Sequence, residues 1–147
     1  MFMRKLMPAL LACLLLTSPP LMADQAASVE VEDPWLRAGP TVQRNLAGYL
    51  TLHNRSDEPV AVVGFETDLA ASSELHTMSI GEDGMMSMQR ILAIEIPPQG
   101  SHALAPGGDH LMLVNLKNPL EPGAEYEITL TFSDGSRKTL LFEARRP

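Results

Sequence analysis

Short runs of apolar and β-branched residues alternate with turn-forming residues along most of this 147-residue chain. The turns contain Gly, Pro, Asn or Asp and recur about every 8 to 14 residues, which is typical of short strands joined by tight connections. No stretch of helical length shows a clear 3.6-residue repeat. The pattern predicts an all-β fold, an antiparallel sandwich or barrel of about seven to nine strands. The candidate strands are 47–53, 60–65, 74–79, 85–91, 101–105, 110–115, 125–132 and 137–142.

Two of the turns predict β-hairpins. Residues 81–84 read Gly-Glu-Asp-Gly and separate the candidate strands 74–79 and 85–91. Asp134 and Gly135 form a dipeptide that favours a two-residue type I′ turn, in which both central residues have positive φ. Each hairpin would bring one face of its two strands together.

Alternation along residues 110–113 separates two kinds of side chain. Leu111 and Leu113 share one face of the strand, since successive side chains point to opposite faces. We expect that face to point into the core. His110 and Met112 would then lie together on the opposite, outer face. A methionine beside a histidine on an outer face requires a functional explanation.

Methionines and histidines concentrate in one part of the chain. Four of the nine methionines fall within the first 22 residues, and the other five are Met78, Met85, Met86, Met88 and Met112. The histidines in or beside this window are His76, His102 and His110. A core uses methionine to fill irregular gaps, but a core would draw it from every strand. The clustering therefore favours a binding site.

Thioether and imidazole donors together favour a soft metal ion. A thioether is neutral and polarisable, so it binds Cu(I) well and Zn(II) or Mg(II) poorly. A blue-copper electron-transfer site would need a cysteine thiolate, and the single cysteine is Cys13. That count also excludes a disulfide scaffold and a cysteine-rich zinc site. No HExxH motif and no nucleophile–base arrangement stands out, so we expect no enzymatic activity.

The first 23 residues are typical of a secretory signal peptide. A basic pair precedes the apolar run 6–16, which is shorter than the roughly 20 apolar residues needed to span a bilayer. We expect cleavage near Ala23, leaving 24–147 as a single domain without a membrane-spanning segment. The alternative is a lipoprotein, because residues 10–13 (Leu-Leu-Ala-Cys) loosely resemble a lipobox.

The charge of the chain argues against one broad class of partner. Lysine and arginine number 11 against 18 aspartates and glutamates, so the formal net charge is -7, and no basic block is present. Nucleic-acid binding requires clustered cations that displace counterions from phosphates. We therefore expect no nucleic-acid partner.

The spacing of four residues resembles the motif of the periplasmic copper chaperones of the PCu(A)C type. That motif is a His, an optional Met, ten residues, a Met, twenty-one residues and then His-x-Met, and the chain matches this spacing throughout. The match begins at His76, with Thr77 at the optional position. The other motif positions are Met88, His110 and Met112. Flanking segments agree, at residues 35–37, 48–54, 96–98 and 106–113.

The resemblance implies a cupredoxin-like Greek-key β-sandwich that carries one Cu(I) ion in the bacterial periplasm. It implies that the ligands are His76, Met88, His110 and Met112. It also implies delivery of copper to cytochrome c oxidase assembly, at the copper A centre of subunit II, either directly or through a thiol copper chaperone. Some members have a His- and Met-rich C-terminal tail, but residues 142–147 contain neither. We therefore expect one copper site, and a monomer.

The remaining residues of the window have less specific expectations. Met78, Met85 and Met86 are expected at the rim of the site or in contact with a partner, with direct metal ligation as the open alternative. The residues expected to be structural are His53, His102, Trp35 and Tyr49. Two alternative functions remain: a copper redox or electron-transfer protein, and a metal-free β-sandwich interaction module.

Overall fold

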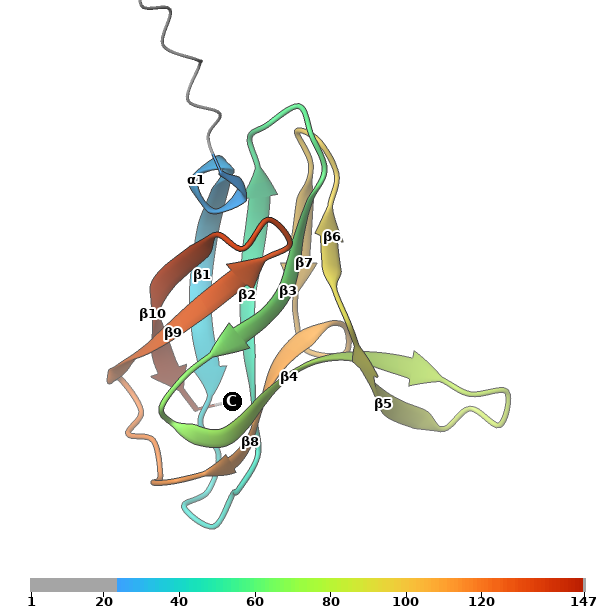
Figure 1. The fold of residues 1–147 in the computed structure, drawn as a ribbon. Coiled ribbons are helices and arrows are strands. Elements are labelled where there is room, and N and C mark those ends of the chain that lie inside the picture. The colour runs from blue at the N-terminus through green and yellow to red at the C-terminus, as the bar shows by residue number, and fades with distance from the viewer. Residues whose placement is uncertain (1–23, 147) are drawn as a thin grey trace, which may run out of the picture.

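The computed structural model describes residues 24–146 (Figure 1). It starts with one short helix, α1 (Gln25–Ser28), capped by Asp24, whose side chain accepts a hydrogen bond from the Ala27 nitrogen at 2.7 Å. The other regular elements of this part are ten strands. They are β1 (Val29–Arg37), β2 (Leu46–Asn54), β3 (Val60–Glu66), β4 (Ala70–Ile80), β5 (Met86–Ile91), β6 (Ile94–Ile96), β7 (Ser101–Leu104), β8 (His110–Leu116), β9 (Glu125–Phe132) and β10 (Arg137–Arg145).

The strands form one hydrogen-bonded sheet that folds over on itself. Its order is β5-β4-β8-β2-β1-β10-β9-β3-β6, and β7 pairs with the part of β2 that β8 leaves free. Strands β1 and β10 are parallel, and the other pairs are antiparallel. The fold is a sandwich because buried residues from both ends of this order form one core. Among them are Leu36, Leu52, Leu113, Ile128, Leu130 and Phe142.

The all-β prediction is confirmed, but ten strands are present rather than seven to nine. Strand β3 does not pair with β2, which precedes it in the chain, but with β9. The strands absent from the prediction are β1 and β6. Strand β1 contains Pro34 and a register shift between Glu32 and Trp35, so its alternation is broken in the sequence. Strand β6 has only three residues.

The predicted hairpin around residues 81–84 is present as β4 and β5. Gly84 supplies the positive φ of 77° that its turn requires. Strand β4 pairs with β8 only as far as His76. Beyond that residue it pairs with β5 alone. The outer half of the hairpin is therefore two-stranded, and Figure 1 shows it projecting from the body of the sandwich.

The β9–β10 hairpin is present, but its predicted type I′ turn is wrong. The strands end at Phe132 and resume at Arg137, so the connection has four residues, 133–136. Gly135 has a positive φ of 83°, whereas Asp134 does not have a positive φ. Asp134 instead uses its carboxylate to accept hydrogen bonds from the nitrogen and hydroxyl of Ser136, which stabilises the longer loop.

Within residues 24–146, no helix combines the length and hydrophobicity needed to cross a membrane. The predicted signal peptide, its cleavage near Ala23 and the lipobox alternative all fall on residues 1–23, which lie outside the described part of the chain.

Candidate metal centre

Strand β8 lies between β4 and β2, and this central position determines the surroundings of His110 and Met112. Leu111 and Leu113 point into the core, as predicted. His110 and Met112 lie on the other face but are only 3% and 7% exposed. The expectation of an open outer face is therefore wrong for these two residues. An aromatic side chain contributes to the covering, because the Tyr49 ring centroid lies 6.3 Å from that of His110.

His76 lies directly opposite His110 in the β4–β8 register. The two imidazole centroids are 5.7 Å apart and the rings meet edge to face, at 61°. Trp35 extends the row of rings, with its centroid 4.8 Å from that of Tyr49. Strand pairing thus brings together two histidines that are far apart in the sequence, beside apolar aromatic surface that limits access of water.

Each histidine uses one ring nitrogen in a hydrogen bond. His110 Nδ1 lies 3.0 Å from the Gly108 carbonyl oxygen, which can only accept, so Nδ1 carries the proton. His76 Nε2 lies 2.7 Å from Glu74 Oε2 and donates to that carboxylate. The hydrogen bond from His76, aided by the positive charge of Arg90, holds the pKa of Glu74 below its usual range. Glu74 is therefore an ionised acceptor at neutral pH.

The other nitrogen of each ring is buried and unpaired. His76 Nδ1 and His110 Nε2 have no hydrogen-bond partner among residues 24–146. With the tautomers fixed by the bonds above, each of these atoms carries a lone pair. A buried polar atom without a partner costs about 1–3 kcal/mol, and two on neighbouring rings require an explanation. Two oriented imidazole lone pairs suit a metal ion, because the other nitrogen of each ring is already held by a hydrogen bond.

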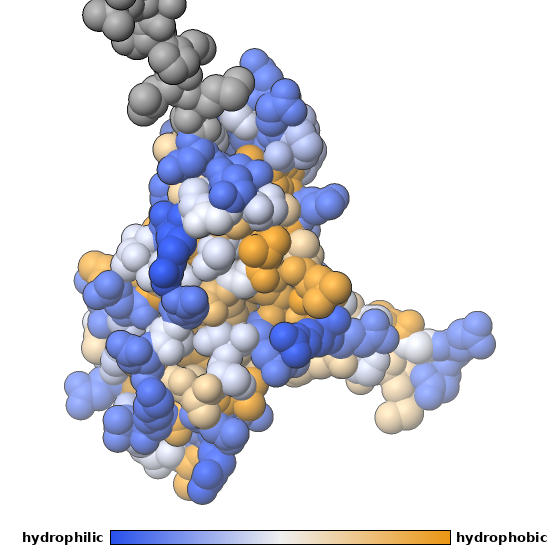
Figure 2. Space-filling view, viewed as in Figure 1, coloured by the Kyte–Doolittle hydropathy of each residue, from blue (hydrophilic) through white to orange (hydrophobic). Residues whose placement is uncertain are grey.

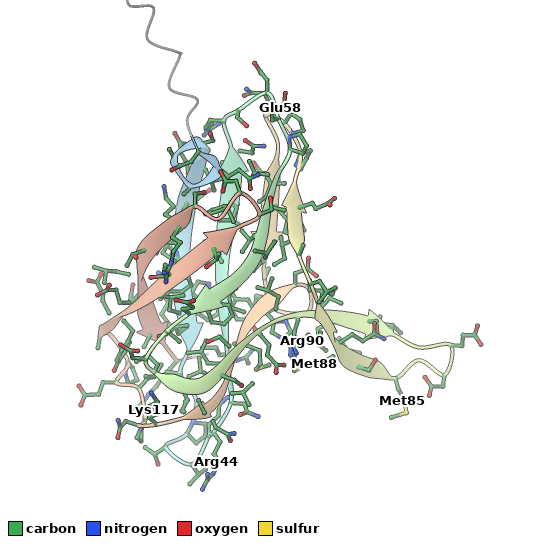
Figure 3. All side chains as sticks on the ribbon, in the orientation of Figure 1. Arg44, Glu58, Met85, Met88, Arg90 and Lys117 are labelled. Carbon is green, nitrogen blue, oxygen red and sulfur yellow. The ribbon has the colours of Figure 1, made fainter. Side chains whose placement is uncertain are left out.

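The two candidate methionines differ in exposure. Met112 lies opposite Glu74 on β4 and Ala47 on β2, on the same face as His110, and is buried. Met88 lies on β5 opposite Met78 and is 54% exposed. Figure 3 shows it close to Arg90 at the base of the hairpin. Because Arg90 pairs with His76, Met88 is a diagonal neighbour of that histidine, within reach of a long side chain.

The four residues of the motif are thus positioned by three adjacent strands. Strand β4 supplies His76, β8 supplies His110 and Met112, and β5 supplies Met88. Three of the four are shielded, and one is open to solvent. Among the described residues, no group of three or more His, Cys, Asp or Glu side chains could hold a metal ion.

A family model described as LpqE-like, "Putative lipoprotein LpqE-like", matches residues 29–144. This range covers all of the strands described above except the last residue of β10. The chain belongs to the LpqE-like family. In the remainder of the chain, residues 1–28 and 145–147 lie outside the match.

Two curated relatives resemble the LpqE-like chain in sequence. "Putative lipoprotein Lxx21020" of Leifsonia xyli subsp. xyli (strain CTCB07) is 36% identical over 113 residues, which make up 76% of this chain and 66% of that protein. "Uncharacterized protein RP573" of Rickettsia prowazekii (strain Madrid E) is 30% identical over 116 residues, or 76% of this chain and 64% of that protein. The match spans just under two thirds of the length of either relative.

Solved structures of PCuAC domains share the fold of the LpqE-like chain. The copper-bound PCuAC domain from PmoF2 has a TM-score of 0.70 and 26% identity, covering 83% of this chain and 96% of that domain. The apo PCuAC domain from PmoF1 has a TM-score of 0.72 and 27% identity, with coverages of 83% and 97%. The solution structure of CuI-DR1885 from Deinococcus radiodurans has a TM-score of 0.67 and 37% identity, covering 83% and 81%.

The other two histidines of the LpqE-like chain are paired with carboxylates. His53 Nε2 lies 2.7 Å from Glu32 Oε2, and its Nδ1 lies 2.6 Å from the Ser101 hydroxyl. His102 Nε2 lies 2.8 Å from Asp109 Oδ2. These contacts join neighbouring strands and loops at the surface. They differ from the His76 and His110 rings, in which one nitrogen is buried and unpaired.

Sequence reasoning missed two groups that orient the histidines, the Glu74 carboxylate and the Gly108 carbonyl. Glu74 could have been found, because it precedes His76 by two residues and alternation places it on the same face. The Gly108 carbonyl had no such signal. Its position depends on the turn before β8, in which the nitrogen of Gly108 donates to the Ala105 carbonyl at 3.0 Å.

Proposed function

We propose that this protein is a copper chaperone that binds one Cu(I) ion through His76, Met88, His110 and Met112. The observation that carries the proposal is the pair of buried, unpaired imidazole nitrogens on facing strands. The similarity to PCuAC domains solved with copper supports it. The copper ion is cargo in this role, and the protein itself catalyses no reaction.

The chemistry of the four donors favours the cuprous ion. His76 Nδ1 and His110 Nε2 supply two neutral imidazoles, and the two methionines supply neutral thioethers. Such a set suits soft Cu(I). It contains no carboxylate or thiolate, which are donors that would stabilise Cu(II). The Glu74 carboxylate accepts from the far nitrogen of His76 and so raises the basicity of the ligating nitrogen.

The uneven burial of the donors suits transfer. His110 and Met112 are enclosed, so bound Cu(I) is shielded from solvent, while Met88 is open to a second protein. An acceptor that carries thiolates can displace Met88 first and the buried donors afterwards. We propose that the acceptor is subunit II of cytochrome c oxidase, at its copper A centre, or a thiol copper chaperone that serves it.

The same proposal places the protein in the periplasm. Residues 1–23 would act as the export signal, and residues 24–147 would form the copper-carrying domain. The names of the LpqE-like family and of one relative include the word lipoprotein, which supports export and keeps lipid attachment at Cys13 as an alternative route to the same compartment.

An anaerobic Cu(I) titration against a chromophoric chelator tests the proposal. The mature protein is compared with a His110→Ala/Met112→Leu variant, and thermal unfolding of both apo-proteins is recorded. We expect one tightly bound equivalent in the wild type and none in the variant. Met112→Leu alone roughly conserves the buried volume and keeps the test decisive if the double variant fails to fold. Absence of competition by the wild type would refute copper binding.

A further inference from the structure

Three methionines other than the buried Met112 share one face of the β4–β5 hairpin. Met78 pairs directly with Met88, and Ile80 pairs with Met86. Side chains two residues apart on a strand point to the same side, so these residues lie on the face that also carries His76. We call Met78, Met86 and Met88 the thioether face. It begins beside the histidine pair and runs outward along the hairpin.

The thioether face has no covering layer. Met86 is 57% exposed, and Ile80 is exposed as well. The opposite side of the same hairpin is polar, with Thr77 opposite Gln89 and a hydroxyl pair between Ser79 and Ser87, 3.1 Å apart. Figure 2 shows that this arm carries apolar colour and that its tip is hydrophilic. Among the residues 77–80 and 86–89 that pair with each other, the apolar side chains therefore lie on one side of the arm.

Gap filling in a core does not explain these methionines, because they do not lie in a core. Contiguous apolar side chains on an exposed surface mark interaction or ligand-binding sites, whereas single ones are common. Three of the four apolar positions on this side are methionine, and only methionine combines apolar character with a sulfur donor. Directly opposite residues on antiparallel strands have Cβ atoms about 4.5–5.5 Å apart, and diagonal neighbours remain within reach of long side chains.

We propose that Met78, Met86 and Met88 form an outer binding site for a soft monovalent cation, from which Met88 passes the ion to the histidine pair. This inference rests on the proposed Cu(I) site and extends it outward. Met88 belongs to both sets, since it lies opposite Met78 and diagonal to His76. The ion enters or leaves along the arm and is never without a sulfur ligand.

The transfer between the two sites is a ligand exchange. The bonds from the ion to the sulfurs of Met78 and Met86 break, and bonds to His76 Nδ1, His110 Nε2 and the Met112 sulfur form, while the Met88 sulfur stays bound. Copper remains Cu(I) throughout, and no proton moves, because both receiving nitrogens already carry lone pairs. Three thioethers bind more weakly than a set that includes two imidazoles, so the ion rests at the inner site.

Silver titration followed by methionine-methyl NMR tests for the outer site. Ag(I) is the probe because it is soft, monovalent and not oxidised in air. We expect the first equivalent to shift the methyl signals of Met88 and Met112, and the second to shift those of Met78 and Met86 and to shift that of Met88 again, because its sulfur is shared by the two sites. A Met78→Leu/Met86→Leu variant should bind the first equivalent as the wild type does and lose the second.

Met85→Leu is the matched control. Met85 is exposed and lies one residue before β5, outside the Met78–Met88 and Ile80–Met86 pairs. We expect both equivalents to be retained in this variant. Loss of the second equivalent in Met85→Leu, or its retention in Met78→Leu/Met86→Leu, would refute the assignment of the outer site to the thioether face.

The rate of Cu(I) release to a thiolate chelator tests the relay. We expect slower release from Met78→Leu/Met86→Leu than from the wild type, with unchanged affinity for the first equivalent. An unchanged release rate would refute the relay and leave these methionines as a contact surface for a partner protein. Failure of the proposed function gives a different result, because wild-type protein would then not retain the first equivalent of either ion.

Discussion

His76 and His110 show how a second hydrogen bond decides what an imidazole can do. Each ring holds its proton on the nitrogen that faces an oxygen acceptor, and each leaves the other nitrogen buried with a lone pair. The acceptors differ, since Glu74 is a charged carboxylate and Gly108 supplies a neutral carbonyl. The two histidines therefore have unequal outer partners, one charged and one neutral.

Replacing Glu74 by Gln tests this inequality. The amide oxygen still accepts the hydrogen bond from His76 Nε2, but the negative charge is lost. Outer partners of metal-bound histidines typically contribute about 10–100-fold to metal affinity, so we expect Cu(I) affinity to fall by about tenfold or more in competition titrations. Glu82→Gln, at the exposed hairpin turn, should leave it unchanged. Equal affinities for wild type and Glu74→Gln would show that the carboxylate has no influence on the site.

Replacing Met88 by Leu separates binding from folding. Met88 is exposed and the two side chains have similar volumes, so we expect the free energy of unfolding of the apo-protein to change by less than about 1.5 kcal/mol. Cu(I) affinity should nevertheless fall, because leucine has no donor atom. Chemical denaturation and chelator competition measure the two quantities. A larger loss of apo-protein stability would identify Met88 as a packing residue instead of a ligand.

Alternation at His110–Leu113 correctly predicted which side chains share a face, but it did not predict burial of His110 and Met112. Alternation is a local property, readable from four residues. Tyr49 on β2 contributes to the cover over His110 and itself packs against Trp35 on β1, and strand pairing between distant segments of the sequence brings these rings together. The sequence contains no local signal for that pairing.

At the scale of elements, the turn residues were the most informative part of the sequence. The Gly-Glu-Asp-Gly turn correctly predicted the hairpin of β4 and β5. Strand β1 was missed because Asp33 adopts a positive φ of 48° before Pro34, which interrupts the alternating pattern. The strand nevertheless forms, because it pairs with β2 on one side and with β10 on the other.

The loop between β9 and β10 also holds the start of the described chain. Asp134 Oδ2 accepts a hydrogen bond from the backbone nitrogen of Gln25 at 2.8 Å, and Ser136 Oγ accepts one from Ala26. The bond from Gln25, with those from Ser136, lowers the pKa of Asp134. A carboxylate whose pKa is lower in the folded state stabilises the fold above its unfolded pKa, and the effect is lost as the pH falls through the folded value.

Asp134→Asn should therefore lower the thermal unfolding temperature at pH 7, because one acceptor of the Gln25 or Ser136 bonds is lost. The difference from wild type should shrink below about pH 4, where the carboxylate of the unfolded chain begins to be protonated, and should disappear as the pH falls through the lower pKa of the folded state. Thermal unfolding followed by circular dichroism at both pH values measures this. A difference that stays constant into strong acid would show that Asp134 acts through something other than its charge.

At the scale of the whole molecule, the core of the sandwich and the proposed copper site are built from different residues. The core consists of aliphatic and aromatic side chains from both layers, and His76, Met88, His110 and Met112 are not among its members. The resemblance to copper chaperones implied both fold and ligands from one motif, whereas the residues alone predicted only a β-sandwich with a soft-metal site. Strand pairing supplies what the motif leaves out, which is the register that sets His76 opposite His110.

The mass of the exported protein decides between two forms of the whole molecule. Expressed with its first 23 residues in a Gram-negative host, the protein should be recovered from the periplasm with Asp24 as its first residue. That mass corresponds to cleavage after Ala23. A mass that corresponds to residues 13–147 with a diacylglyceryl group on Cys13, recovered in the membrane fraction, would instead establish the lipoprotein form. Intact-mass spectrometry of both fractions distinguishes the two.

Strand β4 pairs with β8 from Ala70 to His76 and with β5 from Leu75 to Ile80, so only Leu75 and His76 are paired on both sides. The part beyond His76 should open locally more readily, since amides in a two-stranded ribbon exchange with solvent more readily than those in the middle of a sheet. His76 stands at the boundary. Fraying of the arm moves Met88 without disturbing the β4–β8 ladder, so ion release need not await unfolding of the sandwich. Hydrogen exchange should show fast amides at residues 78–80 and slow ones at 75 and 76, and uniform protection along β4 would exclude this local opening.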